Sequence, residues 1–290
     1  MKSIRWIAVL GMAAVMTAQG AAVKKAEAPL LCYVGGTMRP AMEELAKLYE
    51  QKTGRKVTMD FADSGQLMVK IEQTGIGDLY VAHDPFPAGV LKKGLGRRVW
   101  TTAVVDPLIV VAKGNPKGVQ GFRDLAKPGL RVILSDDKYS TAGHVVARMA
   151  EKAGLTAALN SNIVSRMRGG SEAVNAVLLG TADAAVVWRA VAVARAGKLD
   201  TVPLEQDLLL VKGVDAVTTA TYGVIEMDCI HVGIVSLTSS KMPEAAAAFA
   251  EFVAAPENRS VWDKHGFARV PEGRDLPAAL PAATKVPAAR

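Results

Sequence analysis

The sequence has few of the features that mark most enzymes, metal proteins and nucleic-acid-binding proteins. Two cysteines in 290 residues are too few for a disulfide framework, and the lack of a Cys-x-x-Cys motif argues against structural zinc. No run of five like charges occurs, which excludes a nucleic-acid-binding tail despite the net charge of +7. No GxSxG, HExxH, P-loop or dinucleotide-binding motif has a suitable context. We therefore expect no enzymatic reaction, no cofactor and no nucleic-acid partner.

Long apolar runs are also missing. The apolar stretch Ile7–Met16 has about half of the roughly 20 residues that a membrane-spanning helix needs. It follows Lys2 and Arg5 and leads into small residues up to Ala22, an order that is typical of a secretory signal peptide. The sequence thus predicts a signal peptide over residues 1–22, cleaved near Ala22, and a periplasmic mature protein.

The two cysteines leave their redox state open. In an oxidising compartment Cys32 and Cys229 could form a disulfide, or they could remain two separate buried thiols. Bulky Leu30 and Leu31 precede Cys32, which makes this cysteine a poor lipoprotein anchor.

The rest of the composition is that of a globular protein, with 50% hydrophobic and 22% charged residues, and the length suits two lobes. Short apolar segments of strand length alternate with amphipathic segments of helical period. The predicted strands are 30–34, 57–61, 79–82, 108–112, 130–134, 184–188 and 230–237, and the predicted helices are 40–51, 66–73, 145–153, 173–179 and 243–254. This alternation predicts an α/β protein with parallel sheets and helices on both faces. The segment 271–290 is rich in proline and is predicted to be a loose tail.

Four predicted helices begin with glycine beside a hydroxyl residue: Gly35-Gly36-Thr37, Asp63-Ser64-Gly65, Ser140-Thr141-Ala142-Gly143 and Gly169-Gly170-Ser171. The first turn of a helix has unpaired N–H groups and the positive end of the helix dipole, so it favours anions. In α/β sheets such loops gather at the carboxyl ends of the strands. The alternative is that Thr37, Ser64, Thr141 and Ser171 are ordinary helix N-caps.

The sequence resembles periplasmic molybdate-binding proteins of ABC importers. The segments that carry the resemblance include YVGGTMRPAMEELA (33–46), FADSGQL (61–67), GDLYVAHD (77–84) and DPLIVVAKGNP (106–116). The resemblance implies a two-lobed periplasmic binding protein fold, in which each lobe is a mostly parallel sheet flanked by helices. It places lobe 1 at 28–105 plus 232–290 and lobe 2 at 106–231, joined by a two-strand hinge near Asp106 and Cys229. The implied protein is a monomer that delivers a tetrahedral oxyanion, such as molybdate or tungstate, to a membrane ABC permease.

The resemblance also implies a ligand site made of neutral donors. The hydroxyls of Thr37 and Ser64 would bind from lobe 1, and the backbone amides of Ala142 and Gly170 from lobe 2. Gly36, Gly143 and Ser171 belong to the same loops and are candidate ligand residues as well. A tyrosine of the family corresponds to Trp188, whose indole N–H is a donor of different size and reach.

Histidines offer an alternative ligand class. His83, Asp84, His144 and His231 could hold a transition-metal ion or a metal complex in the cleft. His83 and Asp84 could instead bond to each other or to the backbone. A neutral His144 at a helix start would suit an anion as well as a metal.

Two further arrangements are weaker indications of function. Cys229 and His231 would share one face of a strand, but no third residue in the sequence is placed to orient them as a catalytic pair. Arg39, Arg166 and Arg168 lie beside the glycine-containing loops and could steer an anion by long-range attraction.

Overall fold

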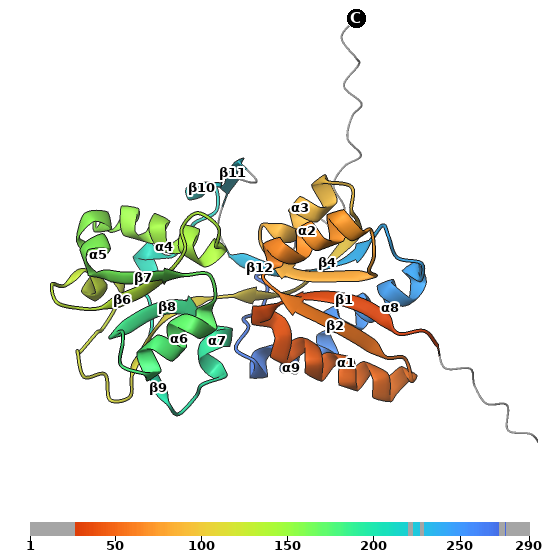
Figure 1. The fold of residues 1–290 in the computed structure, drawn as a ribbon, viewed down its shortest axis with the longest axis horizontal. Helices are drawn as coiled ribbons and strands as arrows, with labels where there is room; N and C mark the ends of the chain where they lie inside the picture. The colour runs from red at the N-terminus through yellow and green to blue at the C-terminus, as the bar shows by residue number, and fades with distance from the viewer. Residues whose placement is uncertain (1–26, 220–222, 227–228, 273–275, 277–290) are drawn as a thin grey trace, which may run out of the picture.

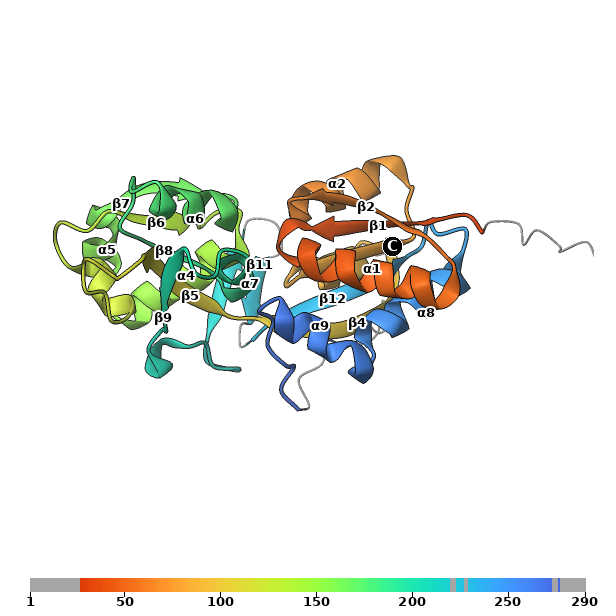
Figure 2. The same cartoon turned by 90° about the horizontal axis from the view of Figure 1, so that it is seen from below.

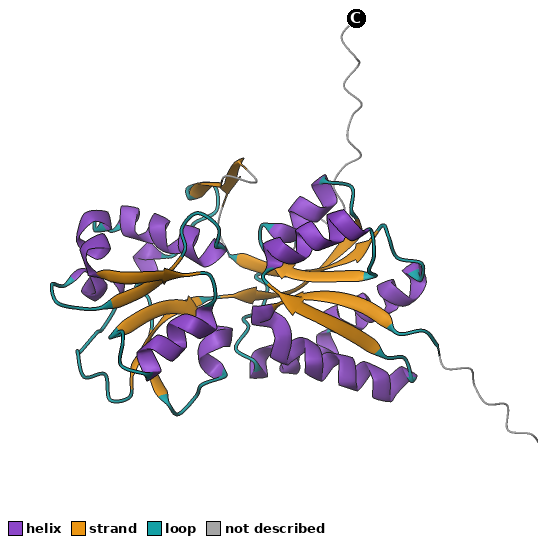
Figure 3. Ribbon diagram, viewed as in Figure 1, coloured by secondary structure: helices purple, strands orange, loops and turns teal. Residues whose placement is uncertain are grey.

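The computed structural model describes residues 27–219, 223–226, 229–272 and 276. The predicted signal peptide and most of the predicted tail lie outside these ranges. The described residues form two five-stranded sheets, of strand order β2-β1-β3-β12-β4 and β7-β6-β8-β5-β9, and a small β10-β11 hairpin. Each large sheet with its helices is one lobe, and the two lobes lie side by side (Figures 1 and 3). We call them lobe 1 and lobe 2 in that order; the residue boundaries predicted above stay a prediction.

Lobe 1 is a three-layer α/β arrangement. Its strands are β1 (Leu30–Gly35), β2 (Val57–Ala62), β3 (Leu79–His83), β4 (Gly96–Val105) and β12 (Ile230–Leu237). Its helices are α1 (Arg39–Thr53), α2 (Ser64–Thr74), α3 (Phe86–Lys92), α8 (Pro243–Ala254) and α9 (Arg259–Lys264). Alternate residues of β3 enter different cores: Leu79 and Val81 pack with α1 and α8, whereas Tyr80 and Ala82 pack with α2 and α3.

Lobe 2 repeats this design. Its strands are β5 (Pro107–Ala112), β6 (Val132–Ser135), β7 (Ile163–Met167), β8 (Ala184–Trp188) and β9 (Leu199–Val202). Its helices are α4 (Thr141–Lys152), α5 (Thr156–Asn162), α6 (Gly170–Leu178) and α7 (Arg189–Val193). Helices α4 and α5 cover one face, and α6 and α7 cover the other (Figure 2). The hairpin comprises β10 (Ala216–Thr219) and β11 (Gly223–Glu226).

Each sheet is mixed because one of its strands runs against its neighbours, where the sequence predicted parallel pairing. Strand β1 is parallel to β2 and β3, and β6 is parallel to β7 and β8. In contrast, β12 is antiparallel to β3 and β4, and β5 is antiparallel to β8 and β9. The chain enters lobe 2 through β5 and returns to lobe 1 through β12, so both strands run away from the junction between the lobes. The remaining strands run toward it and place their carboxyl ends there.

The junction between the lobes contains both crossing segments. Strand β4 ends at Val105 and β5 begins at Pro107, with Asp106 between them, while Ile230 at the start of β12 pairs with Val105. The largest hydrophobic core, which includes Val105, Ile109 and Ile230, continues through this junction into both lobes.

Candidate functional site

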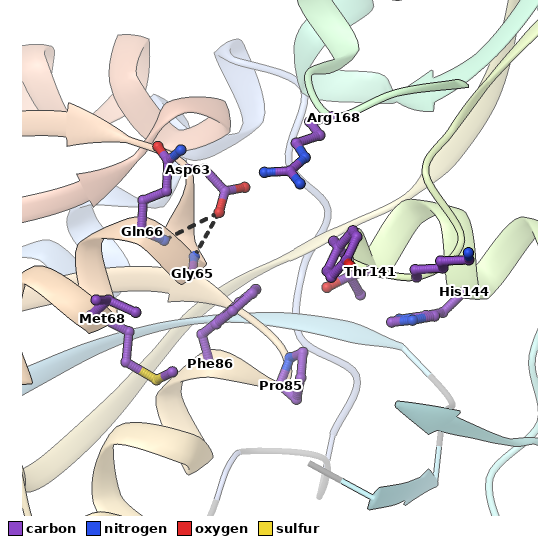
Figure 4. A pocket seen from close by; sticks show the side chains of 12 residues that line it. Asp63, Gly65, Gln66, Met68, Pro85, Phe86, Thr141, His144 and Arg168 are labelled. Carbon is purple, nitrogen blue, oxygen red and sulfur yellow. Dashed lines mark hydrogen bonds between the residues drawn. The ribbon is translucent and has the colours of Figure 1, made fainter. Parts of the chain in front are cut away.

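A pocket of about 420 Å³ lies between the lobes (Figure 4). Lobe 1 contributes the first turns of α2 and the turn between β3 and α3. Lobe 2 contributes the β6–α4 loop, the start of α4 and Arg168 in the loop between β7 and α6. The volume falls in the range of small-molecule sites. This pocket is the candidate solute site.

Two of the four predicted helix starts line the pocket, Gly65 at the start of α2 and Thr141 at the start of α4. The third, Gly169-Gly170-Ser171, contributes no lining residue, although Arg168 directly before it does. The Gly35-Gly36-Thr37 loop does not contribute a lining residue. The pocket lining also omits Ser64, Ala142, Gly143, Gly170, Ser171 and Trp188. Of the predicted ligand residues, Ser64, Ala142 and Gly143 adjoin lining residues along the chain. Direct contact of any predicted ligand residue with a solute stays a prediction.

The alternative that Thr37, Ser64, Thr141 and Ser171 cap the helices is wrong, because none of the four occupies an N-cap position. Asp63, Ser140 and Gly169 occupy the N-cap positions of α2, α4 and α6, one residue before Ser64, Thr141 and the Gly170-Ser171 pair. The Asp63 side chain accepts hydrogen bonds from the N–H groups of Gly65 at 2.9 Å and Gln66 at 3.3 Å (Figure 4). The start of α2 is thus already bound to a carboxylate of the chain itself, which disfavours a second anion there.

Ser64 lies just inside that helix start. The residue is 5% exposed, and its carbonyl oxygen accepts a hydrogen bond from the Tyr80 hydroxyl at 2.8 Å. A Cβ atom on Gly35 would lie 2.5 Å from the Ser64 hydroxyl oxygen. Glycine at position 35 therefore lets the end of β1 approach this serine closely.

Gly143 has a packing role that the sequence did not reveal. A Cβ atom at this position would lie 2.1 Å from the Asp136 carbonyl oxygen and 2.7 Å from the Asp137 nitrogen. Both neighbours are backbone atoms, so the first turn of α4 can pack on the β6–α4 loop only if residue 143 is glycine. By contrast, a Cβ atom on Gly36 would meet only the Ala62 carbonyl oxygen, at 4.0 Å.

Two side-chain contacts join the lobes beside the pocket. The Thr141 hydroxyl donates a hydrogen bond to the Asp84 carbonyl oxygen at 2.8 Å. The proton of this hydroxyl is therefore already used in a hydrogen bond within the protein. Trp188, at the end of β8, is 5% exposed and meets the His83 ring edge to face, with 5.8 Å between ring centroids. Burial lowers the pKa of His83 below its ordinary value, and a neutral ring suits this aromatic contact.

Asp84 and His231 form a buried pair next to the hinge. Asp84 Oδ2 accepts hydrogen bonds from His231 Nδ1 at 2.8 Å and from the His231 backbone N–H at 2.9 Å. The other ring nitrogen, Nε2, lies 3.3 Å from Cys229 Sγ. Burial alone would lower the pKa of His231, but the hydrogen bonds to Asp84 and Cys229 outweigh it and raise the pKa to about 10. The imidazole is therefore charged at neutral pH.

This pair supplies the orienting residue that the sequence did not show for Cys229 and His231. Asp84 and His231 are 147 positions apart, and only the pairing of β3 with β12 brings them together. The same geometry argues against the alternative metal site at His83, Asp84, His144 and His231. His83 Nδ1 bonds to the Asp84 carbonyl oxygen, and His144 lies in the pocket wall instead. Among the described residues, no three His, Cys, Asp or Glu side chains are grouped to hold a metal ion.

Of the two alternatives for the cysteines, the structure shows two separate thiols. Cys32 lies in β1 with no exposed surface, while Cys229 is half-buried directly before β12. Burial raises the pKa of the Cys32 thiol far above its ordinary range, so this thiol is neutral and unreactive.

Only one of the three arginines predicted to steer an anion lines the pocket. Arg39 pairs with Glu43, and Arg166 pairs with Asp137. Arg168 lies over the Tyr139 ring, 5.0 Å from its centroid, and Lys138 is its basic neighbour in the pocket wall. In the described ranges neither Arg168 nor Lys138 forms an ion pair. The lobe 2 wall therefore carries two positive charges without acidic partners.

His144 adds a polar group without a charge. It lies in the first turns of α4 and lines the pocket. Burial lowers its pKa below the ordinary value near 6.5, so the imidazole is neutral above that pH. This finding agrees with the neutral ring predicted from its place at a helix start.

No helix in the described part of the chain is long and apolar enough to cross a membrane.

Known proteins with this fold and related sequences bind solutes. A putative binding protein of Haemophilus influenzae is 27% identical over 241 residues, which are 83% of this chain and 91% of that protein. The molybdate-binding protein ModA of Mycobacterium bovis is 25% identical over 243 residues, which are 83% of this chain and 84% of that protein. The periplasmic molybdate-binding protein of Azotobacter vinelandii has the same fold, with a TM-score of 0.68 at 17% identity, and the match covers 84% of this chain and 100% of that one. Because the family described as bacterial extracellular solute-binding protein matches residues 30–268, the chain belongs to that family.

Proposed function

We propose that the protein captures a small anionic solute in the pocket between its lobes and delivers it to a membrane ABC permease. The observation that carries the proposal is the pair of cationic side chains, Arg168 and Lys138, that line the pocket and have no ion-pair partner among the described residues. The start of α4, next to Thr141, adds the positive end of a helix dipole on the same side. A solute with an oxyanion group suits this wall.

The relatives support an oxyanion as the recognised group. ModA of Mycobacterium bovis is named for molybdate, which is an oxyanion, and this name supports the same class of ligand for the present pocket. Within this proposal, the hydroxyl of Ser64 and the backbone amides of Ala142 and Gly170 donate further hydrogen bonds to the solute. The described residues provide no hydrogen-bond partner for the Ser64 hydroxyl, which leaves it available to a solute.

Thermal unfolding of the mature protein, residues 23–290, tests the proposal. A solute at a thousand times its dissociation constant stabilises the folded state by about 4 kcal/mol, which for lobes of this size raises Tm by roughly 10 °C. We expect such a shift with at least one oxyanion among molybdate, tungstate, sulfate, phosphate and organic carboxylates, phosphates or sulfonates. The shift should persist in a chelator, because no metal takes part. No shift with any of these anions would contradict the proposal.

The affinity should also be nearly independent of pH between about 6.5 and 9. Arg168 and Lys138 supply the positive charge of the pocket wall. His144 is neutral throughout this pH range, because burial lowers its pKa. Isothermal titration across this range measures the dissociation constant for the anion that gives the largest Tm shift. A tenfold loss of affinity between pH 6.5 and 8 would show instead that a protonated histidine binds the anion.

A further inference from the structure

The pocket is several times larger than a mineral oxyanion. Its volume is about 420 Å³, whereas four oxygen atoms at about the volume of water each occupy on the order of 100 Å³. A bare tetrahedral ion bound by Arg168 would leave most of this volume to water. A larger solute would fill it and contact both lobes.

The walls of the pocket are partly apolar. Met68, Val69 and Phe86 line it from lobe 1, and Tyr139 lines it from lobe 2. Val69 and Tyr139 are 46% and 61% exposed, although both are large hydrophobic side chains. Such surfaces gain from contact with carbon atoms of a solute, but they offer nothing to a fully hydrated mineral ion.

Opposite charges face each other across the pocket. Figure 4 shows Asp63 on the lobe 1 side and Arg168 on the lobe 2 side, and no ion pair joins them in the described structure. One carboxylate oxygen of Asp63, Oδ1, accepts the bonds from the helix N–H groups. The carboxylate repels an anion but binds a hydroxyl or ammonium group well.

We propose that the solute is an organic oxyanion with a short carbon body. Its carboxylate, phosphate or sulfonate group binds Arg168 and Lys138, its carbon atoms contact Tyr139, and a hydroxyl or amine at its other end donates to Asp63. This inference rests on the proposed function, because it concerns the same pocket and names the class of solute.

Matched probes separate the contribution of each part of the solute. We would measure dissociation constants of the mature protein by isothermal titration in three series, each with a bare head group, a propyl body and a dihydroxypropyl body. The phosphate series is phosphate, propyl phosphate and glycerol 3-phosphate. The sulfonate series is sulfate, propanesulfonate and 2,3-dihydroxypropanesulfonate, and the carboxylate series is formate, butyrate and 3,4-dihydroxybutyrate. In at least one series we expect the carbon body to strengthen binding about tenfold and the hydroxyl groups to strengthen it further.

Three substitutions give different expected patterns. Arg168→Gln should weaken binding of every member of the preferred series by about tenfold or more. Tyr139→Ser should weaken only the members with a carbon body. Asp63→Asn keeps a helix-capping side chain, yet it should weaken the dihydroxy compound and slightly strengthen the bare ion, because the repulsion is removed. The matched control is Val164→Ser, which removes a 53% exposed apolar side chain outside the pocket and should change no affinity.

The outcomes distinguish this inference from the proposed function. If the bare ions bind as tightly as the organic members, and Asp63→Asn strengthens all of them, the solute is a mineral oxyanion; the inference is then overturned while the proposed function stands. If no member of the three series and neither molybdate nor tungstate binds, both are overturned.

Discussion

Replacing His231 by Gln is expected to lower the free energy of unfolding by roughly 3–5 kcal/mol at pH 6.5, the usual effect of removing one partner of a buried ion pair. His231 is 8% exposed, and its ring donates to Asp84 at 2.8 Å. Glutamine leaves the half-buried Asp84 carboxylate without its charged partner. Chemical denaturation of the mature protein measures the loss.

The same loss should depend on pH. The pKa of His231 is raised to about 10 in the folded protein, whereas the unfolded value is about 6.5. Since the folded pKa is the higher one, the proton stabilises the folded state fully below pH 6.5, and this contribution disappears as the pH rises through about 10. The difference in unfolding free energy between the wild type and His231→Gln should therefore shrink between pH 6.5 and 10.

A control separates this buried pair from an ordinary surface pair. In the exposed ion pair of Asp60 with Lys70, Oδ2 and Nζ are 2.6 Å apart. Asp60→Asn removes this pair and should change the free energy of unfolding by less than about 1 kcal/mol. If the destabilisation by His231→Gln were the same at pH 6.5 and pH 10, the imidazole would not be charged in the folded protein.

Gly143→Ala should damage stability and solute binding together. The new Cβ atom would lie 2.1 Å from the Asp136 carbonyl oxygen, so α4 and the loop before it must move apart. We expect a loss of about 3 kcal/mol in the free energy of unfolding. Lys138 and Tyr139 lie in the displaced loop and line the pocket, so anion affinity should fall at least about tenfold.

Gly36→Ala is the matched control for this substitution. Gly36 is exposed, and a Cβ atom there meets only one backbone oxygen at 4.0 Å. Stability should change by less than about 1 kcal/mol. If Gly143→Ala behaved like Gly36→Ala in denaturation, the close packing of α4 on Asp136 would be wrong. If Gly36→Ala alone abolished binding, the Gly35-Gly36-Thr37 loop would belong to the site despite its distance from the pocket lining.

The parts of the fold with a clear apolar period could be predicted from the sequence. Strand β12 and helix α8 have the predicted bounds, 230–237 and 243–254, because β12 is a mostly apolar segment that is buried throughout and α8 has buried residues at helical spacing. Strand β4 was not predicted, because it begins with a glycine and two exposed arginines, Gly96 to Arg98. The family match confirms the expectation of a solute-binding protein rather than an enzyme.

The site could be predicted only as a set of loops. Glycine and hydroxyl residues located three loops that border the pocket, because helix starts need such residues whatever the fold. The sequence could not decide whether Asp63 or Ser64 caps α2, since both residue types favour that position. Nor could it pair Asp84 with His231, because their contact depends on the register of β12 against β3.

The hydrophobic core that passes through the hinge makes the two lobes a single cooperative unit. Val105 and Ile230 at the crossing segments belong to the same cluster as Leu30 in lobe 1 and Leu134 in lobe 2. Melting of one lobe would expose apolar side chains that the other lobe covers, so heating should produce one calorimetric transition for both. A solute bound between the lobes then slows hydrogen exchange even in α8, which does not line the pocket, because the amides of this helix open only when the whole unit unfolds.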